Sequence, residues 1–183
     1  SPFRRQLLER LGVPFATFAP QIDESRQPGE TAQQLVRRLA EAKARAAASA
    51  FPDALIIGSD QVAVCGGDIL GKPGTHDNAC RQLARLAGRR VSFLTGLCLF
   101  DSCSAGMRLD LVPYHVTFRA LSEAQIDRYL HAERPYNCAG SFKSEGLGIA
   151  LFERFEGSDP NALIGLPLIR LTTMLARAGV VLP

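Results

Sequence analysis

The sequence predicts a single α/β domain, residues 1–183, in which a central mixed sheet is flanked by helices. Short apolar runs that are typical of strands alternate along the chain with stretches whose apolar residues have helical spacing. A length of 183 residues suits one domain, and a hydrophobic content of 46% supplies a core. Because helices and strands alternate in a partly mixed order, we expect both parallel and antiparallel neighbours in the sheet.

The first thirty residues indicate a short helix, a strand and a polar loop. Ser1 and Pro2 are favourable at a helix start, and Gly12 ends the leucine-rich stretch that follows them. Residues 13–19 alternate in the manner of a strand, and residues 20–29 are polar. This segment is therefore expected to add one helix and one strand to the fold.

Residues 31–70 predict a long helix and then a hairpin. Thr31 and Gln34 form a capping box. The apolar positions of the helix that follows are Leu35, Leu39, Ala42 and Ala46. The apolar run 55–57, bounded by Gly58, indicates a buried strand that ends where the backbone turns or approaches another group closely. The Cys-Gly-Gly-Asp sequence at 65–68 predicts a hairpin turn into a short second strand.

The middle of the chain predicts a helix and two long strands. Residues 75–87 have helical spacing, and Gly88 closes that helix. Residues 91–100 are strongly apolar, and a short loop separates them from a second strand pattern at 107–118. Two long strands with a short loop indicate antiparallel pairing. Pro113 places the second strand at a sheet edge or beside a bulge.

The last third predicts a helix, a functional loop and a closing helix. Ser122 and Gln125 form another capping box. Residues 133–148 contain small residues around one aromatic, one cation and one carboxylate, a composition that more often carries function than packing. Residues 149–152 indicate a returning strand, and residues 161–178 a final helix.

Composition and charge exclude several classes of protein. The net charge of +3 is far from the basic load of a nucleic-acid binder, and aromatic and basic residues are not interleaved along a strand as in an RNA-binding module. No apolar run approaches the roughly 20 residues that a membrane span needs. The five cysteines are odd in number and form no C-x-x-C pair. We therefore expect a cytoplasmic protein that binds a small anionic ligand, with a homodimer as one option for its assembly.

The three histidines give no zinc signature. His76, His115 and His131 are far apart in the sequence and lack the spacing of metal ligands. A zinc site is therefore not expected, and each histidine is interpreted as a surface or cap residue.

Asp60 is the leading candidate for chemistry. It follows Gly58 and Ser59 near the end of the predicted central strand, and Lys72 lies on a second loop. A carboxylate there can hold a divalent cation or take a proton from water, and the lysine can supply opposing positive charge. The alternative is a strand end with an ordinary turn aspartate, and spacing leaves both open.

Several other charged residues have two interpretations each. The helix start at Ser1 and Arg4 is suited to a phosphate because free N–H groups and the helix dipole favour anions, but an ordinary surface helix has the same pattern. Lys43 lies beside the apolar stripe of its helix, where it can flank a pocket or snorkel from a buried face. Glu24 is either a solvated loop carboxylate or a cation ligand. Phe142 is either a core residue or a contact for a base.

Seven short motifs together carry a family resemblance. In chain order they are Ser1-Pro2-Phe3-Arg4-Arg5, Asp23-Glu24, Glu41-Ala42-Lys43-Ala44, Gly58-Ser59-Asp60-Gln61, Gly71-Lys72-Pro73, Ala139-Gly140-Ser141 and Gly165-Leu166-Pro167. Their order and spacing resemble the Maf family of nucleoside triphosphate pyrophosphatases over nearly the whole chain. The family has a short strand and a small-residue loop before the serine that corresponds to Ser1, and the present sequence starts after them. The resemblance thus implies one Maf-like domain, 1–183, without that strand and loop.

The resemblance implies an activity and a set of site residues. Maf proteins hydrolyse nucleoside triphosphates between the α and β phosphates, giving a monophosphate and pyrophosphate with a divalent cation. By resemblance, Asp60 is the proton acceptor, and the residues around the phosphates are Ser1, Arg4, Lys43 and Lys72. The physical chemistry agrees, because attack by water on a polyanion requires cations that shield its approach. Glu24 and Asp60 carry hard oxygen ligands suited to Mg²⁺ or Mn²⁺.

The branch of the family is indicated by three further residues. One branch reads Ala-Asp-Thr at the catalytic turn, carries a glutamine in the late loop and acts on dTTP and UTP. The present chain has Gln61 after its aspartate and Glu145 in the late loop, which resembles the branch that hydrolyses 7-methyl-GTP. By resemblance, Phe3, Gln61 and Glu145 occupy the three positions that determine substrate specificity in the family. Since N7-methylation makes guanine cationic, a carboxylate can read its N1–H and amine while an aromatic ring stacks on it.

A second class of function fits part of the same pattern. A non-catalytic nucleotide-binding regulator of cell division would need the phosphate contacts but not Asp60 together with Lys72. The sequence contains both residues, which favours the enzyme.

Overall fold

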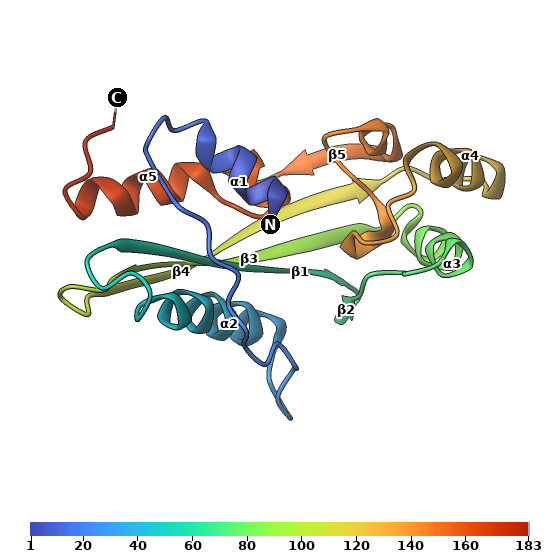
Figure 1. Cartoon of the computed structure of the whole chain (residues 1–183). Helices are drawn as coiled ribbons and strands as arrows, with labels where there is room; N and C mark the ends of the chain where they lie inside the picture. The colour runs from blue at the N-terminus through green and yellow to red at the C-terminus, as the bar shows by residue number, and fades with distance from the viewer. Residues whose placement is uncertain (183) are drawn as a thin grey trace. The chain divides into compact units, whose positions relative to one another are not determined.

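A computed structural model describes residues 1–182 of the chain, which carry a five-stranded sheet with the order β2-β1-β3-β4-β5 (Figure 1). The helices are α1 (Pro2–Glu9), α2 (Ala32–Ala47), α3 (His76–Leu86), α4 (Glu123–Glu133) and α5 (Leu168–Arg177), with short 3-10 turns η1 (Ala139–Ser141), η2 (Leu147–Leu151) and η3 (Pro160–Leu163). The strands are β1 (Leu55–Cys65), β2 (Asp68–Leu70), β3 (Arg90–Asp101), β4 (Met107–Phe118) and β5 (Phe152–Glu156).

The chain divides into two compact units. Unit 1 contains Ser1–Gln61, Leu94–Pro113 and the residues from Asp159 onward, and unit 2 contains Val62–Phe93 and Tyr114–Ser158. The predicted α/β class, with a central sheet and flanking helices, is confirmed. Within the residues that the structure describes, no helix has both the length and the apolar character needed to cross a bilayer.

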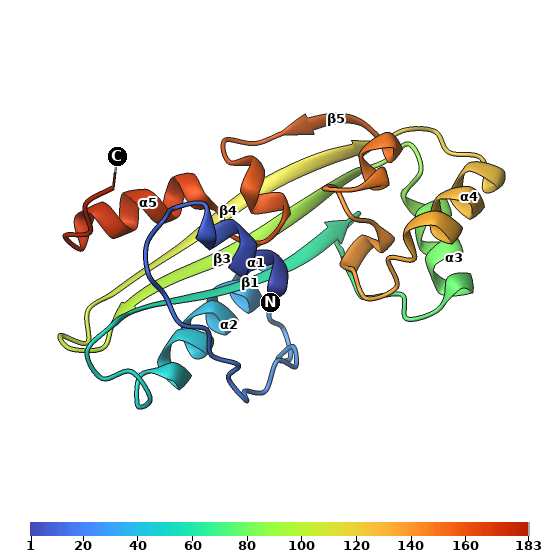
Figure 2. The same cartoon turned by 45° about the horizontal axis from the view of Figure 1, so that its top comes forward.

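The strand pairs are antiparallel where the sequence predicted a mixture. β1 pairs with β2 and β4 with β5 in antiparallel registers, and Figure 2 shows neighbouring strands running in alternate directions. The N–H of Asp101 donates to the carbonyl of Gly106 at 2.8 Å, which closes the hairpin from β3 to β4. A parallel pair requires a crossover that returns the chain to its starting edge. The expectation of parallel neighbours was therefore wrong. An alternation of helices and strands in the sequence does not show whether the chain crosses back over the sheet between two strands.

Local sequence signals for helix starts and turns are confirmed. Thr31 and Gln34 at α2, and Ser122 and Gln125 at α4, form complete capping boxes. The glycines of the β1–β2 hairpin have φ angles of +60° and +91°, which disfavour a side chain. Pro113 lies in the part of β4 that precedes the register with β5, which begins at His115. The proline is therefore tolerated because the ladder on that side starts beyond it.

Four predicted elements differ in the structure. The apolar run 55–57 predicted a strand that ends at Gly58, but β1 continues through Gly58 and Asp60 to Cys65. Residues 13–19 form neither helix nor strand, and Phe18 there packs edge-on against Phe51 at 6.0 Å between ring centroids. Alternation alone does not supply the partner strand that a ladder requires. The predicted strand at 149–152 is mostly η2, and β5 begins at its last residue. The predicted helix at 161–178 is split into η3 and α5 by a loop that contains Gly165 at φ +113°.

The core of unit 1 lies on both faces of its strands. Leucines of α1 and α5 pack on one face with Leu97 and Leu99, whereas alanines of α2 pack on the other with Ile56 and Cys98 (Figure 1). A Cβ at Gly58 would lie 2.1 Å from the Ala40 carbonyl oxygen. The glycine thus allows the backbone of α2 to approach β1 closely, which positions the face of α2 that carries Lys43.

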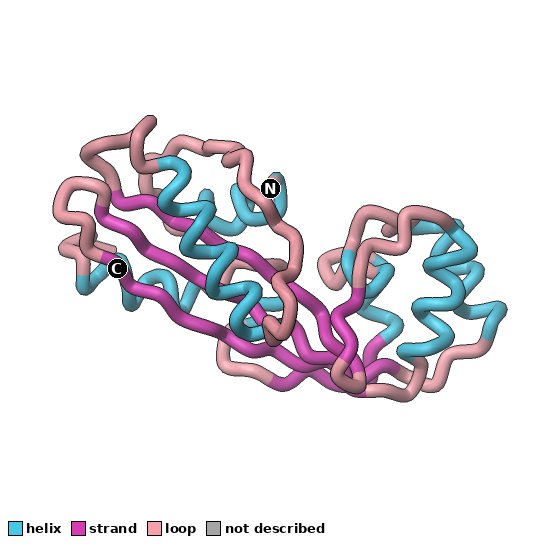
Figure 3. The backbone as a smooth tube through the Cα atoms, turned by 90° about the horizontal axis from the view of Figure 1, so that it is seen from below, coloured by secondary structure: helices cyan, strands magenta, loops and turns pink. Residues whose placement is uncertain are grey.

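The core of unit 2 contains an aromatic cluster next to the packed helices α3 and α4. The ring centroid of Phe142 lies 4.8 Å from that of Phe152, 5.4 Å from that of Phe93 and 5.7 Å from that of Phe118. Only 6% of Phe142 is exposed. Phe142 is therefore a core residue, which decides between the two interpretations of its place in the loop. Figure 3 shows how the loops of the chain connect the helices and strands.

Candidate active site in unit 1

Asp60, Lys43 and Glu24 form one cluster in unit 1. Asp60 lies on β1, Lys43 on α2 and Glu24 on the loop before α2. The ammonium nitrogen of Lys43 is 2.7 Å from Oδ1 of Asp60 and 2.8 Å from Oε1 of Glu24. Both side chains are largely buried, with 12% of Asp60 and 17% of Lys43 exposed. The fold thus brings together three residues that spacing alone left uncertain.

Arg4 extends the cluster from the first helix. Its Nε donates to the carbonyl oxygen of Gly165 at 2.7 Å, and its pKa is lowered by burial, while the nearby charges of Asp60 and Glu24 act in the opposite direction. The guanidinium is therefore within electrostatic reach of both carboxylates. The hydroxyl of Ser59 donates to the same carbonyl at 2.9 Å. The carbonyl oxygen of Gly165 thus links α1 to β1 at the residue that precedes Asp60.

A buried aspartate that sequence analysis did not single out holds the Gly165 loop. Asp159 is 1% exposed, and its Oδ1 accepts from the backbone N–H of Asn161 at 3.0 Å. Its Oδ2 accepts from the N–H of Ile169 at 2.7 Å, near the start of α5. One carboxylate therefore caps two consecutive helical turns and sets the path of the loop between them. The Asp-Pro pair at 159–160 is a helix-start signal that could have identified it.

Gln61 is turned toward the protein interior. Its Nε2 donates to Oγ1 of Thr95 at 2.9 Å and also to the carbonyl of Ala162. The hydroxyl of Thr95 donates to the same Ala162 carbonyl at 3.0 Å. These bonds connect β1 and β3 to η3. The Gln61 amide is thus engaged within unit 1, at the position that the resemblance marks for specificity.

The start of α1 is open to solvent. Ser1 is the N-cap, its side chain makes no capping hydrogen bond, and its carbonyl accepts from the N–H of Arg5 at 3.1 Å. Phe3 is 38% exposed. The phosphate contact at Ser1 and the base contact at Phe3 remain predictions.

Lys72 and Glu145 lie in unit 2 and are exposed. The charges of both residues affect the pKa of the Cys138 thiol, which is raised chiefly by burial. Lys143 and Lys72 oppose that shift, whereas Glu145 adds to it. All three charges therefore act on the same half-buried thiol. Unit 2 thus presents two cations and a carboxylate on neighbouring loops, whereas the other seven predicted site residues belong to unit 1.

The donor set of unit 1 fits a hard divalent cation. Both Glu24 and Asp60 already direct a carboxylate oxygen at one cationic nitrogen, that of Lys43. Two carboxylates that face a common positive charge are suited to Mg²⁺ or Mn²⁺, which takes few protein ligands and completes its shell with water and phosphate oxygens. The side-chain chemistry is therefore compatible with the metal that the resemblance implies.

Comparison with known proteins identifies close relatives along the whole chain. A sequence model of the family described as "Maf-like protein" matches residues 1–178. The 7-methyl-GTP pyrophosphatase of Alcanivorax borkumensis is 58% identical over 183 residues, which covers 100% of this chain and 93% of the relative. The protein of the same name from Methylobacillus flagellatus is 58% identical over 98% of this chain and 94% of its own. That from Pseudomonas syringae pv. tomato is 56% identical over 100% and 95%.

Proposed function

The chain belongs to the Maf family, and from this membership we propose that it hydrolyses 7-methyl-GTP between the α and β phosphates. The products are 7-methyl-GMP and pyrophosphate, which makes the protein a hydrolase acting on an acid anhydride. Relatives with 56–58% identity and nearly full coverage carry the name 7-methyl-GTP pyrophosphatase. The observation that carries the proposal is the largely buried Asp60 held against Lys43 and near Arg4.

In the proposed mechanism, Asp60 accepts a proton from the attacking water. Nucleotide binding supplies phosphate oxygens as new partners for Lys43, which frees the Asp60 carboxylate to act as a base. Lys43 and Arg4 stabilise the charge that develops on the phosphates, and Arg4 is fixed for this by its bond to Gly165. Ser1, at the open start of α1, and Lys72 in unit 2 are proposed as further phosphate contacts.

Glu24 and Asp60 are the residues that we propose to hold the divalent cation, Mg²⁺ or Mn²⁺. When bound, the cation neutralises phosphate charge and polarises the scissile anhydride. The loop carboxylate of Glu24 is the more exposed of the two, at 59% for its side chain. The Glu24 side chain can therefore change conformation when the metal binds, whereas the position of Asp60 is fixed by its strand.

Specificity for the methylated base is proposed to come from Glu145, with Phe3 as a stacking surface. The carboxylate of Glu145 is exposed, and its Oε2 accepts from the hydroxyl of Ser144 at 3.2 Å. An exposed carboxylate can accept from the N1–H and the amine of guanine. Gln61 contributes indirectly, because its amide fixes the backbone around Ala162.

The test is a substrate panel assayed for pyrophosphate. Wild type and Asp60→Asn are incubated with 7-methyl-GTP, GTP, dTTP and UTP, with and without Mn²⁺. We expect wild type to prefer 7-methyl-GTP, and Asp60→Asn to lose about 10²–10⁴-fold in kcat because the general base is gone. Binding of a non-hydrolysable 7-methyl-GTP analogue should persist. The matched control is Asp53→Asn, an exposed aspartate of unit 1.

The alternative function is a non-catalytic nucleotide-binding regulator of cell division. It requires nucleotide binding without turnover, so equal and negligible pyrophosphate release by wild type and Asp60→Asn would favour it over the enzyme. We place the proposed enzyme in the cytoplasm, where nucleoside triphosphates are available.

A further inference from the structure

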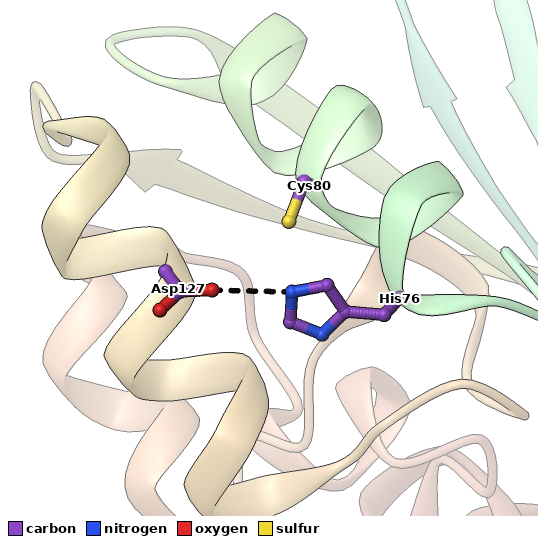
Figure 4. Close-up of side chains that lie close together, drawn as sticks. All are labelled: His76, Cys80 and Asp127. Carbon is purple, nitrogen blue, oxygen red and sulfur yellow. Dashed lines mark hydrogen bonds and ion pairs between the residues drawn. The ribbon is translucent and has the colours of Figure 1, made fainter.

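Unit 2 contains a cluster of three potential metal ligands. His76 and Cys80 project from α3 toward Asp127 on α4 (Figure 4). Their ligand atoms, an imidazole nitrogen, the thiol sulfur and a carboxylate oxygen, all lie within 4.8 Å of one another. Nothing in the proposed pyrophosphatase mechanism uses these residues.

The helical spacing explains how the cluster forms. His76 and Cys80 are four residues apart on α3, and Asp127 and His131 are four residues apart on α4. Residues at this spacing share one face of a helix. Because α3 packs against α4, the two faces meet, and the ring centroids of His76 and His131 lie 4.7 Å apart. The separation of the histidines along the chain gives no metal-ligand spacing, because it does not reflect which helices pack together.

The hydrogen bonds around His76 leave a ring nitrogen directed at the cluster. The hydroxyl of Tyr136 donates to the carbonyl of Leu130 at 3.4 Å, so its oxygen is available to accept from Nδ1 of His76 at 3.0 Å. A proton on Nδ1 gives the neutral ring a lone pair on Nε2. That nitrogen faces Oδ1 of Asp127 at 3.2 Å. In the other tautomer Nε2 donates to this carboxylate, whose Oδ1 also lies 3.3 Å from Nδ1 of His131. A metal ion would take the place of the shared proton.

We propose that His76, Cys80 and Asp127 bind a Zn²⁺ ion between α3 and α4, with the fourth position open to water. Nitrogen, sulfur and oxygen donors together suit zinc, whereas Mg²⁺ prefers oxygen alone. The bond from Nδ1 to Tyr136 orients the ring as metal-binding histidines require. One thiolate and one carboxylate balance the charge of the ion.

Metal binding exchanges a proton for the ion. Without metal the Cys80 thiol carries a proton at neutral pH, because an ordinary cysteine titrates above it. On binding, the S–H bond breaks, the proton passes to solvent, and the sulfur electron pair forms the Zn–S bond. Ligands of a tetrahedral zinc are about 3.3–3.8 Å apart. The 3.2 Å between Nε2 of His76 and Oδ1 of Asp127 is slightly shorter than this range, so the pair must separate a little and the sulfur must move closer to both.

The proposal is tested on the full chain after removal of metal with a chelator. Zn²⁺ is titrated in competition with a chromogenic chelator, and Co²⁺ is titrated while the absorption spectrum is recorded. We expect one tight Zn²⁺ per chain in unit 2 and a thiolate-to-cobalt charge-transfer band. Cys80→Ser, His76→Gln and Asp127→Asn should each weaken zinc binding by at least about tenfold.

Two matched controls separate this site from the rest of the protein. Cys103→Ser changes an exposed cysteine of unit 1 and should leave the cobalt band intact. Asp60→Asn removes the proposed catalytic carboxylate and should also leave it intact. A wild-type cobalt spectrum without the thiolate band would refute the proposal, and so would zinc affinity that is unchanged in Cys80→Ser. The wild-type spectrum decides the matter even if a variant fails to fold.

Discussion

The side chain of Arg4 and the carbonyl oxygen of Gly165 are joined by a 2.7 Å hydrogen bond across 161 positions of sequence. The same carbonyl accepts from the hydroxyl of Ser59, the residue before Asp60. One backbone oxygen therefore holds both the proposed phosphate-binding arginine and the strand that carries the proposed base. This geometry gives a structural reason for the Gly-Leu-Pro motif at 165–167, which sequence analysis noted only as part of a family resemblance.

We predict that Gly165→Ala lowers both stability and activity. The φ angle of +113° is strained for alanine, at a cost of about 1–3 kcal/mol. The added Cβ would lie 3.2 Å from Nε of Arg4, so the guanidinium must move. We expect a lower free energy of unfolding in urea and a fall in kcat/KM for the nucleotide substrate.

The matched control is Gly179→Ala. Gly179 also has a positive φ, +87°, but a Cβ there would have open space. It should lose stability without losing activity in the folded protein. Equal loss of kcat/KM in the two variants, measured where both are fully folded, would show that Arg4 does not depend on Gly165.

We predict that Gln61→Glu destabilises unit 1 at neutral pH. The amide of Gln61 donates to Ala162 and Thr95, and a carboxylate would place an acceptor against the Ala162 carbonyl. Loss of the donor and burial of the charge should cost about 1–3 kcal/mol or more of unfolding free energy. Gln33→Glu, at an exposed position of α2, should stay within about 0.5 kcal/mol of wild type. Equal stability of the two variants in urea denaturation would contradict the interior role of Gln61.

We predict that Glu145→Gln reduces the preference for 7-methyl-GTP over GTP. A carboxylate attracts the cationic methylated base, and its charge-assisted hydrogen bonds are worth about 1.5–3 kcal/mol, or roughly 10–100-fold in kcat/KM. An amide keeps the shape of the side chain but removes the charge. Glu153→Gln changes an exposed glutamate of the same unit and serves as the control. An unaltered ratio of kcat/KM for the two substrates in Glu145→Gln would remove the proposed role.

The sequence predicted what is local and missed what depends on the fold. The capping box of Thr31 and Gln34 is confirmed because its partners lie three positions apart. The meeting of Lys43 with Asp60 rested on the family resemblance, because no spacing rule connects a helix to the strand it covers. Asp159 was missed since its second partner, the N–H of Ile169, lies ten positions away.

The same limit explains the errors in strand direction and in the histidines. The pattern of residues 55–101 shows where strands lie but not whether the connection between them crosses the sheet. His76 and His131 are separated by two elements in the sequence, whereas their rings lie 4.7 Å apart. Contacts between elements follow from packing, which pattern reasoning along one chain does not supply.

The ion pair of Glu30 and Arg38 predicts a specific pH dependence. Two hydrogen bonds, of 2.6 and 2.9 Å, join the carboxylate to the guanidinium, and they lower the pKa of Glu30 from an ordinary 4.5 to about 2. Because the pKa is depressed in the folded protein, the stabilisation is complete above pH 4.5 and is lost as the pH falls toward 2. Arg38 also donates to the carbonyl of Ser25 at 2.9 Å, so the pair holds the loop that presents Glu24.

We therefore predict that Glu30→Gln is less stable than wild type at pH 7, and that the difference in unfolding free energy narrows between pH 4.5 and pH 2. The variant should also bind the divalent cation more weakly, since Glu24 is no longer held toward Lys43. Glu41→Gln breaks the more exposed pair with Arg45 and should change stability little at any pH. A difference between Glu30→Gln and wild type that is constant from pH 7 to pH 2 would mean that the lost stability comes from packing and not from the ionised pair.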